Sequence, residues 1–319
     1  MGKWIAGLVA GALATGASAA DFTLVDIGTL GGPGSYGAAV GNDGTVVGCA
    51  DVLPSGAHAF AWKDGVMRDL GMADPGGSSC ALAINDQGVI AGRSSAREVV
   101  VWNGSAVTRL GITGDVGGIN RFGVVVGTFD AGGIDRAFKY SSGRVTPLGT
   151  AGVASAANAI NAKGEIVGTQ GGRATVFETS RLDFGNGAAR GVNDRGMVVG
   201  HVSSAYGQPS AFLYRGAVTM LNAPSYSSAV AINDGGQVVG SGEGVYGWLV
   251  DNGIYQRLAD IPDVVAKGWR HLEPTGINDR GAIVGTATDP QGNLRAFLLV
   301  PKAKAAASKP LRLGKATSP

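Results

Sequence analysis

The feature that most constrains this chain is a ten-residue pattern that recurs seven times. In its clearest copy, residues 83–92, it reads Ala-Ile-Asn-Asp-Gln-Gly-Val-Ile-Ala-Gly. Successive second glycines of the copies are separated by 44, 35, 41, 32, 40 and 45 residues. The glycine pairs are Gly44/Gly48, Gly88/Gly92, Gly123/Gly127, Gly164/Gly168, Gly196/Gly200, Gly236/Gly240 and Gly281/Gly285. A period near 40 residues is typical of propellers, in which each repeat is one supersecondary unit.

Each copy predicts four short strands. A brief apolar run forms the first strand, and Asn-Asp-x-Gly forms a tight turn because its glycine accepts a positive φ. A run rich in valine and isoleucine forms the second strand. Its closing glycine suits a bulge or the close approach of a neighbouring sheet. The third strand is aromatic, as in residues 59–62, and the fourth ends in Leu-Gly, as at residues 69–71.

The two ends of the repeat array complement each other. The seventh copy stops after its third strand, near Val300, whereas residues 22–28 form an orphan fourth strand. Pairing residues 22–28 with residues 295–300 would close the array into a ring and cover its free edges. We therefore expect an all-β fold, a seven-bladed β-propeller of four-stranded repeats over residues 21–300, closed by its N-terminal strand.

The termini predict export. Residues 1–20 contain one lysine, a short apolar stretch and small residues before Asp21, which is typical of a signal peptide. No later segment is long and apolar enough to cross a membrane. Residues 301–319 form a basic tail that we expect to be disordered. Removing its five positive charges and Lys3 leaves the body at 2 − 6 = −4, which argues against nucleic acid binding.

The repeat resembles a known family. The pattern Ala-x-x-Ile-Asn-Asp-x-Gly-x-Val-Val-Gly, followed by His58-Ala59-Phe60 and a terminal Asp-Leu-Gly, is similar to the extracellular HAF-repeat family of bacterial proteins. The resemblance covers residues 22–300, although the histidine of the motif survives only at His58. It implies an exported bacterial repeat protein and supplies no catalytic residues.

The strands expected to line the central channel offer little chemistry. Among the runs predicted to be first strands, Arg190 is the one titratable residue, whereas acid–base catalysis needs positioned ionisable groups. The turn Asn and Asp residues lack the dense oxygen spacing of a calcium loop, and turn formation accounts for them. The three histidines show no ligand spacing. The sequence therefore predicts no cofactor and no metal site, and it favours a binding or structural module over an enzyme.

One insertion stands out between the last two copies. Residues 259–273 form the longest connector of their class and contain Trp269, Arg270, His271 and Glu273. Loops on a rigid scaffold often carry binding residues, and Trp with Arg is typical of interaction hot spots. We expect these four residues, with Tyr206 from a neighbouring loop, to form the binding surface. The alternative is a solvated loop in which Trp269 caps a blade.

Two functions stay open. The first is a secreted or cell-envelope scaffold, monomeric, that binds a glycan, an envelope component or a protein. The second is a polysaccharide lyase or glycosidase that uses acids of the insertion, namely Asp260, Asp263 and Glu273, because such enzymes need paired carboxylates. An enzyme requires two of these carboxylates to converge on a cleft.

The two cysteines, Cys49 and Cys80, predict a disulfide. An exported protein meets an oxidising compartment, and an even count leaves no thiol over. Cys49 falls on the second strand of the first repeat and Cys80 on the first strand of the second repeat, at similar heights. The alternative is a pair of small buried apolar residues on adjoining blades.

Overall fold

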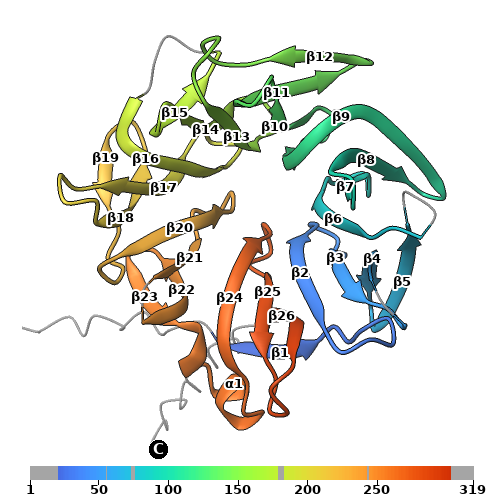
Figure 1. Ribbon diagram of the computed structural model, residues 1–319. Helices are drawn as coiled ribbons and strands as arrows, with labels where there is room; N and C mark the ends of the chain where they lie inside the picture. The colour runs from blue at the N-terminus through green and yellow to red at the C-terminus, as the bar shows by residue number, and fades with distance from the viewer. Residues whose placement is uncertain (1–20, 55, 73–75, 179–182, 243, 303–319) are drawn as a thin grey trace, which may run out of the picture.

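The computed structural model describes residues 21–54, 56–72, 76–178, 183–242 and 244–302. These residues form five antiparallel sheets, arranged around a central axis in chain order (Figure 1). The all-β, propeller-like arrangement agrees with the repeat pattern. The expected signal peptide, residues 1–20, and all but two residues of the expected tail lie outside the described residues.

Three of the sheets have four strands each. The first contains β2 Ser35–Val40, β3 Val46–Asp51, β4 Ala57–Lys63 and β5 Val66–Gly71. The second contains β20 Ser227–Ile232, β21 Val238–Gly242, β22 Val245–Asp251 and β23 Ile254–Arg257. The third contains β24 Arg270–Ile277, β25 Ile283–Thr288, β26 Leu294–Pro301 and β1 Phe22–Asp26.

The other two sheets have seven strands each. One contains β6 Ser79–Ile84, β7 Ile90–Ser94, β8 Glu98–Asn103, β9 Ala106–Ile119, β10 Val125–Asp130, β11 Asp135–Ser141 and β12 Arg144–Pro147. The other contains β13 Ser155–Ile160, β14 Ile166–Gln170, β15 Arg173–Phe177, β16 Asp183–Val192, β17 Val198–Ser203, β18 Pro209–Tyr214 and β19 Val218–Met220. The long strands β9 and β16 each pair with the preceding strand over their first residues and with the following strand over their last residues.

The N-terminal strand pairs with the last strand, as the ends of the sequence predict. β1 runs antiparallel to β26, from Phe22 opposite Pro301 to Asp26 opposite Phe297. The backbone N–H of Lys302 also donates to the carbonyl of Asp21 at 2.8 Å, so the strand continues slightly beyond residue 300. Figure 1 shows the two ends of the described chain side by side in one sheet.

The recurring second glycine marks a bulge in every copy. A Cβ at Gly48 would lie 1.9 Å from the carbonyl oxygen of Tyr36 and 3.0 Å from the ring of Phe60. The register of β2 against β3 shifts at this point, between Gly37 and Ala39. The same close approach occurs at the equivalent glycines of the other six copies. The predicted bulge is confirmed, and the approaching backbone belongs to the adjacent strand of the same sheet.

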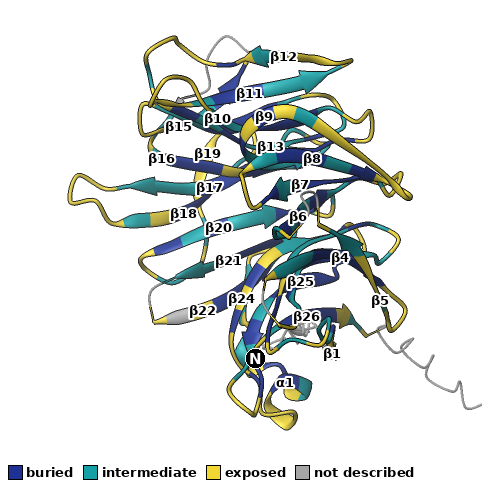
Figure 2. Ribbon diagram, turned by 45° about the vertical axis from the view of Figure 1, so that its right-hand side comes forward, coloured by how far each residue is buried: buried dark blue, intermediate teal, exposed yellow. Residues whose placement is uncertain are grey.

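The core lies between neighbouring sheets. Aromatic side chains of the third strands occupy equivalent positions and are almost fully buried: Phe60, Phe138, Phe212, Trp248 and Phe297. Figure 2 shows buried residues in the middle strands and exposed residues at the turns and outer strands. Burial of these large rings removes apolar surface from water and so stabilises the fold.

The insertion between the last two repeats is ordered, which differs from the loop expected over residues 259–273. It forms the 3₁₀ turn η1 Leu258–Asp260 and the short helix α1 Pro262–Ala266, and its last residues belong to β24. Apolar side chains of this segment join the core that packs against the sheet of β24, β25, β26 and β1. No helix among the described residues is long and apolar enough to cross a membrane.

Candidate functional site

The two ends of the central axis, around which the sheets are arranged, carry different parts of the strands and turns. We call the end that carries the Asn-x-x-Gly turns the turn face, because those turns line one shared cavity of about 250 Å³. We call the opposite end, where the first strand of each repeat begins and the second strand ends, the loop face. Antiparallel pairing fixes this assignment, since the start of one strand lies beside the end of the next.

A ring of buried asparagines lies at the turn face and lines its cavity. Five of the six asparagine side chains accept hydrogen bonds from two backbone N–H groups of their own turn, as Asn85 Oδ1 does from Gln87 and Val89, and Asn233 accepts from that of Gln237. Each also donates through Nδ2 to the next repeat, over 2.8–3.3 Å. The donor–acceptor pairs are Asn85 to Asn120, Asn120 to Asn161, Asn161 to Asn193, Asn193 to Asn233, Asn233 to Asn278, and Asn278 to the carbonyl of Gly41.

The first repeat has Gly41 in place of this asparagine, and its neighbour Asn42 supplies another link. Asn42 Nδ2 donates to Asp86 at 3.0 Å and to Asp279 at 2.8 Å. The sequence explained the turn asparagines by their local role alone. Their contacts between repeats depend on tertiary packing and were missed.

Carboxylates lie beside the asparagine ring. Asp234 Oδ1 accepts from the backbone N–H of Asp194, and Asp279 Oδ1 accepts from that of Asp234, both at 2.8 Å. Burial raises the pKa of Asp234, and the nearby charges of Asp279 and Asp194 add to the increase against the lowering effect of its hydrogen bond. These acids already bind backbone donors. Among the described residues, no three His, Cys, Asp or Glu side chains group as a metal site.

The loop face contains a cavity of about 470 Å³ between the sheet of β17 and β18, the sheet of β20–β22 and β24. We call it the loop-face cavity. It is lined by His201, Pro209, Tyr226, Ser228, Ser241, Gly242, Gly244, Tyr246 and Glu273. Its size falls within the range of about 300–1,000 Å³ that small-molecule sites occupy.

The side chains that line this cavity are held by neighbours. His201 Nδ1 lies 3.1 Å from Ser228 Oγ. Burial lowers the pKa of His201, and the positive charge of Arg190 lowers it further. The imidazole is therefore neutral at neutral pH. Tyr226 accepts a hydrogen bond on its hydroxyl from Gln208 Nε2 at 2.7 Å, and the ring of Tyr246 lies 4.4 Å from the ring of His271.

The structure separates the five predicted binding residues. Glu273 lines the loop-face cavity, and His271 contacts it through Tyr246. Arg270 is exposed on β24 outside the lining, and Tyr206 is 91% exposed in the loop between β17 and β18. Trp269 is only 8% exposed and packs in the core with Leu258 and Ile261. The assignment of Trp269 to a binding surface is therefore wrong, because its apolar ring fills the space beneath the insertion.

The expectation that Arg190 is the one titratable residue on the channel strands is also wrong. β9 and β24 begin earlier than the sequence pattern indicated, and they carry Asp115 and Glu273 at equivalent positions. Arg93 and Arg97 both bond to the Asp115 carboxylate. Strand length was underestimated because these early residues are polar or small and lie outside the apolar run.

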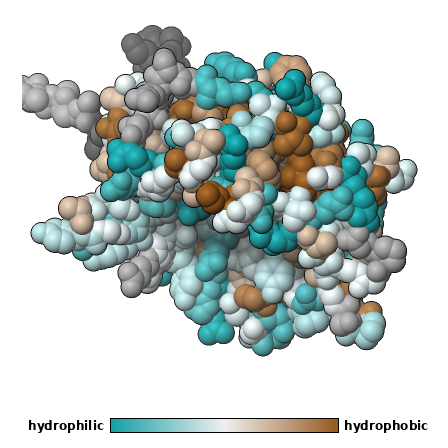
Figure 3. Space-filling model, turned by 45° about the horizontal axis from the view of Figure 1, so that its top comes forward, coloured by the Kyte–Doolittle hydropathy of each residue, from teal (hydrophilic) through white to brown (hydrophobic). Residues whose placement is uncertain are grey.

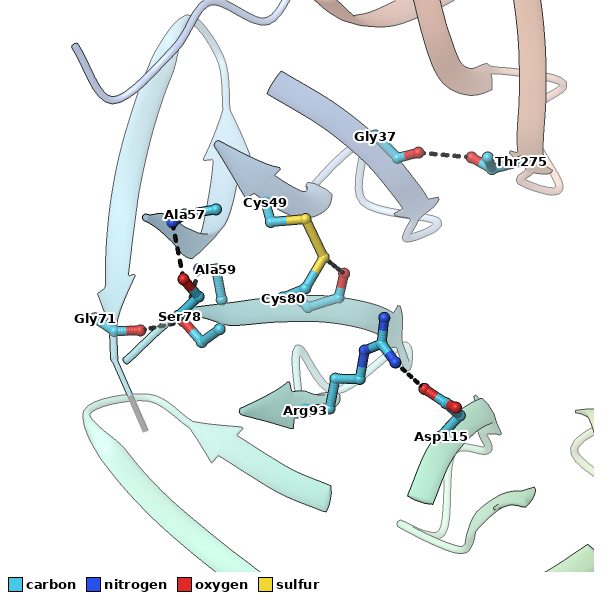
Figure 4. Close-up of a disulfide and its surroundings, with 12 residues drawn as sticks. Gly37, Cys49, Ala57, Ala59, Gly71, Ser78, Cys80, Arg93, Asp115 and Thr275 are labelled. Atoms are coloured by element: carbon cyan, nitrogen blue, oxygen red, sulfur yellow. Dashed lines mark hydrogen bonds and ion pairs between the residues drawn. A yellow bond between two sulfur atoms is a disulfide. The ribbon is translucent and has the colours of Figure 1, made fainter. Parts of the chain in front are cut away.

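Cys49 of β3 and Cys80 of β6 are joined in a disulfide, with Cα atoms 4.7 Å apart (Figure 4). Their strands belong to adjacent sheets, so the bond links two repeats. A serine nearby has a similar bridging role: Ser79 Oγ accepts from the Ala59 N–H at 2.9 Å and donates to the Gly71 carbonyl at 2.6 Å.

Comparisons with known proteins give no assignment. No protein-family model and no curated protein matches the chain. The solved structure of YCF48 bound to D1 peptide is similar over 89% of this chain and 98% of its own, at 10% identity and a TM-score of 0.48. The acylaminoacyl peptidase of Pyrococcus horikoshii is similar over 85% of this chain and 46% of its own, at 13% identity and a TM-score of 0.35. Neither likeness is close enough to transfer residues or function.

Proposed function

We propose that the chain is a closed seven-bladed β-propeller and an exported binding module. The strand pairing supports the blade number. Residues 106–113 of β9 pair with β8 and residues 114–119 with β10, so one long strand serves two units. β16 is divided in the same way between β15 and β17. Each seven-stranded sheet then holds two four-stranded blades, and 3 + 2 × 2 = 7, the number of turn repeats.

The proposed location is the bacterial cell envelope or the extracellular space. The N-terminal signal-like segment and the HAF-type repeat support export, and the disulfide is compatible with an oxidising compartment. The proposed module acts as a monomer, since the ring covers its own strand edges at the closure. We propose no nucleic acid partner, because the folded body carries net negative charge.

One observation carries the binding proposal: four exposed tyrosines lie at the loop face. They are Tyr36, Tyr206, Tyr226 and Tyr246, with exposed fractions between 41% and 91%. Each lies at the start of a first strand, or in or beside a connection that opens on this end. Tyrosine is well suited to recognition, because it combines a large rigid apolar ring with a polar hydroxyl.

On the face shown in Figure 3, apolar side chains form separate patches between polar ones.

The enzymatic alternative has little support from the acids on which it depended. Asp263 bonds to the backbone of Leu24 and to Lys267, and Asp260 lies 3.9 Å from Arg257. Glu273 instead lines the loop-face cavity, on the inner strand of its sheet. The three carboxylates thus have different partners or surroundings, whereas a glycosidase needs two carboxylates that flank the glycosidic bond it cleaves.

The test uses the purified protein, an array of purified glycans and a displayed peptide library. We expect a retained probe to lose binding to the Tyr36→Ala and Tyr206→Ala variants. Phe122→Ala, which removes an exposed aromatic ring from the turn face, is the matched control and should bind normally. The proposal fails if no probe is retained, or if binding depends on Phe122 and not on the tyrosines.

A further inference from the structure

The loop-face cavity has the polarity of a site for an uncharged ligand. Beyond one carboxylate, Glu273, its described lining offers serine hydroxyls, tyrosine rings, glycine backbone and the imidazole of His201. A strongly anionic ligand would meet the Glu273 charge. A strongly cationic ligand would be attracted by Glu273 but repelled by Arg190, whose charge acts on the cavity residue His201. A neutral ligand avoids both costs.

The hydrogen-bond pattern around His201 leaves an acceptor available. Ser228 Oγ lies 3.3 Å from the carbonyl of Ala229 and donates its proton there. In the tautomer that this donation favours, Ser228 accepts from His201 Nδ1, which carries the imidazole proton. The other ring nitrogen, Nε2, is an acceptor. With the two oxygens of Glu273, it provides acceptors suited to ligand hydroxyl groups.

The two tyrosines of the cavity provide preorganised apolar surfaces. Gln208 fixes the hydroxyl of Tyr226, and His271 packs against the ring of Tyr246. Both rings remain more than 40% exposed. A ring held in place loses little conformational entropy when a ligand contacts it. Aromatic faces beside hydroxyl acceptors match a molecule that is apolar on its faces and polar around its edge.

We infer that the loop-face cavity binds an uncharged sugar residue of an oligosaccharide or polysaccharide. The C–H faces of the sugar pack on Tyr226 or Tyr246, and its hydroxyl groups donate to Glu273 and His201. This inference rests on the proposed binding function and narrows its ligand class to neutral carbohydrate.

The test measures binding of three classes of probe by calorimetry: neutral cello-, manno- and chito-oligosaccharides, anionic oligogalacturonate, and a lysine-rich peptide. We expect a neutral oligosaccharide to bind, and Glu273→Gln and Tyr246→Ala to weaken it about tenfold or more. Glu178→Gln makes the same chemical change at an exposed glutamate paired with Lys139, outside the cavity, and should leave affinity unchanged. Unchanged unfolding midpoints identify the variants that remain folded.

Three outcomes overturn the inference. Binding of oligogalacturonate or of the lysine-rich peptide that is lost in Glu273→Gln would assign the cavity to a charged ligand. Neutral oligosaccharide binding that Glu273→Gln and Tyr246→Ala leave intact would place the sugar elsewhere. The inference also fails if no neutral oligosaccharide binds. If Tyr36→Ala and Tyr206→Ala still abolish binding of another probe in these cases, the proposed binding function survives without the carbohydrate assignment.

Discussion

The carboxylate of Asp263 accepts a hydrogen bond from the backbone N–H of Leu24 at 2.7 Å, across 239 positions of sequence. Lys267 Nζ donates to the carbonyl of the same Leu24 at 2.6 Å and to Asp263 at 2.9 Å. Two side chains of the insertion therefore bind the backbone N–H and carbonyl of Leu24, on the edge strand β1. An unpaired edge invites association with other chains, and this pair covers the edge at Leu24.

The first prediction concerns this contact. Replacing Asp263 with alanine removes a charged acceptor from a backbone donor, and we expect the free energy of unfolding to fall by about 1–2 kcal/mol. The loss should be concentrated at β1, so the Leu24 amide should exchange its hydrogen faster. Denaturant titration and hydrogen exchange measure the two effects. Asp260→Ala is the control in the same segment. Asp260 is well exposed, and its carboxylate makes a long ion pair of 3.9 Å with Arg257 Nε. Equal effects of the two variants would contradict the role of Asp263.

The second prediction concerns the asparagine ring. Asn193 is buried, accepts from the N–H groups of Arg195 and Met197, and donates to the Asn233 carbonyl. Asn193→Ala should lower the free energy of unfolding by about 2–3 kcal/mol, because buried donors and acceptors lose their partners. The measurement is chemical denaturation, compared with Asn103→Ala at an exposed hairpin turn. A loss no larger than that of Asn103→Ala would show that the ring adds little.

The third prediction concerns the disulfide. The unfolded, unreduced protein should contain no titratable thiol, because Cys49 and Cys80 are joined. Replacing both with serine should lower the free energy of unfolding by about 3–4 kcal/mol, since the sequence separation is 31 residues and the bond restricts the unfolded chain. A reducing agent should destabilise the native protein and leave the double variant unaffected. Two reactive thiols in the unreduced protein would refute the bond.

The fourth prediction concerns acid stability. Burial alone would raise the pKa of Asp43, but hydrogen bonds from Lys63 and Thr45 outweigh it and lower the pKa from 3.8 to about 2. The folded state thus favours the carboxylate. Its small contribution to stability is complete above about pH 4 and is lost as the pH falls from 3.8 toward 2.

Urea titrations across pH test this prediction. Asp43→Asn and Lys63→Gln should each lower the unfolding midpoint at neutral pH. The difference from the wild type should shrink as the pH falls through the same range, because the wild-type carboxyl becomes protonated. A difference that stays constant between pH 7 and pH 2 would contradict the assigned partners of Asp43.

Local patterns predicted much of the fold because they encode local interactions. The glycine at the turn adopts a positive φ in every copy, as at Gly44 and Gly88. The second glycine sits where a Cβ would overlap the neighbouring carbonyl, as at Gly48. The pairing of β1 with β26 was also predictable, since an array lacking one strand at its end had a spare strand at its beginning.

The candidate site was only partly predictable. The insertion was correctly noticed as unusual, and Glu273 does line a cavity. Composition could not show that Trp269 points into the core, because an aromatic residue in a long connector suits a buried anchor as well as an exposed contact. Tyr226 and Tyr246 had no distinguishing signal, since Tyr226 stands in a connection of ordinary length and Tyr246 near the start of strand β22.

The sequence by itself determined the repeat, its turns, its bulges and the pairing of the first strand with the last, because each depends on residues a few positions apart or on a missing partner. The tertiary structure alone decided what the repeats form together. His201, Ser228 and Glu273 come from three successive repeats and share no motif, yet packing of their sheets brings them to one cavity. The buried asparagines likewise bond across repeats. Such contacts depend on the relative positions of whole sheets, which hydrophobic packing between them sets.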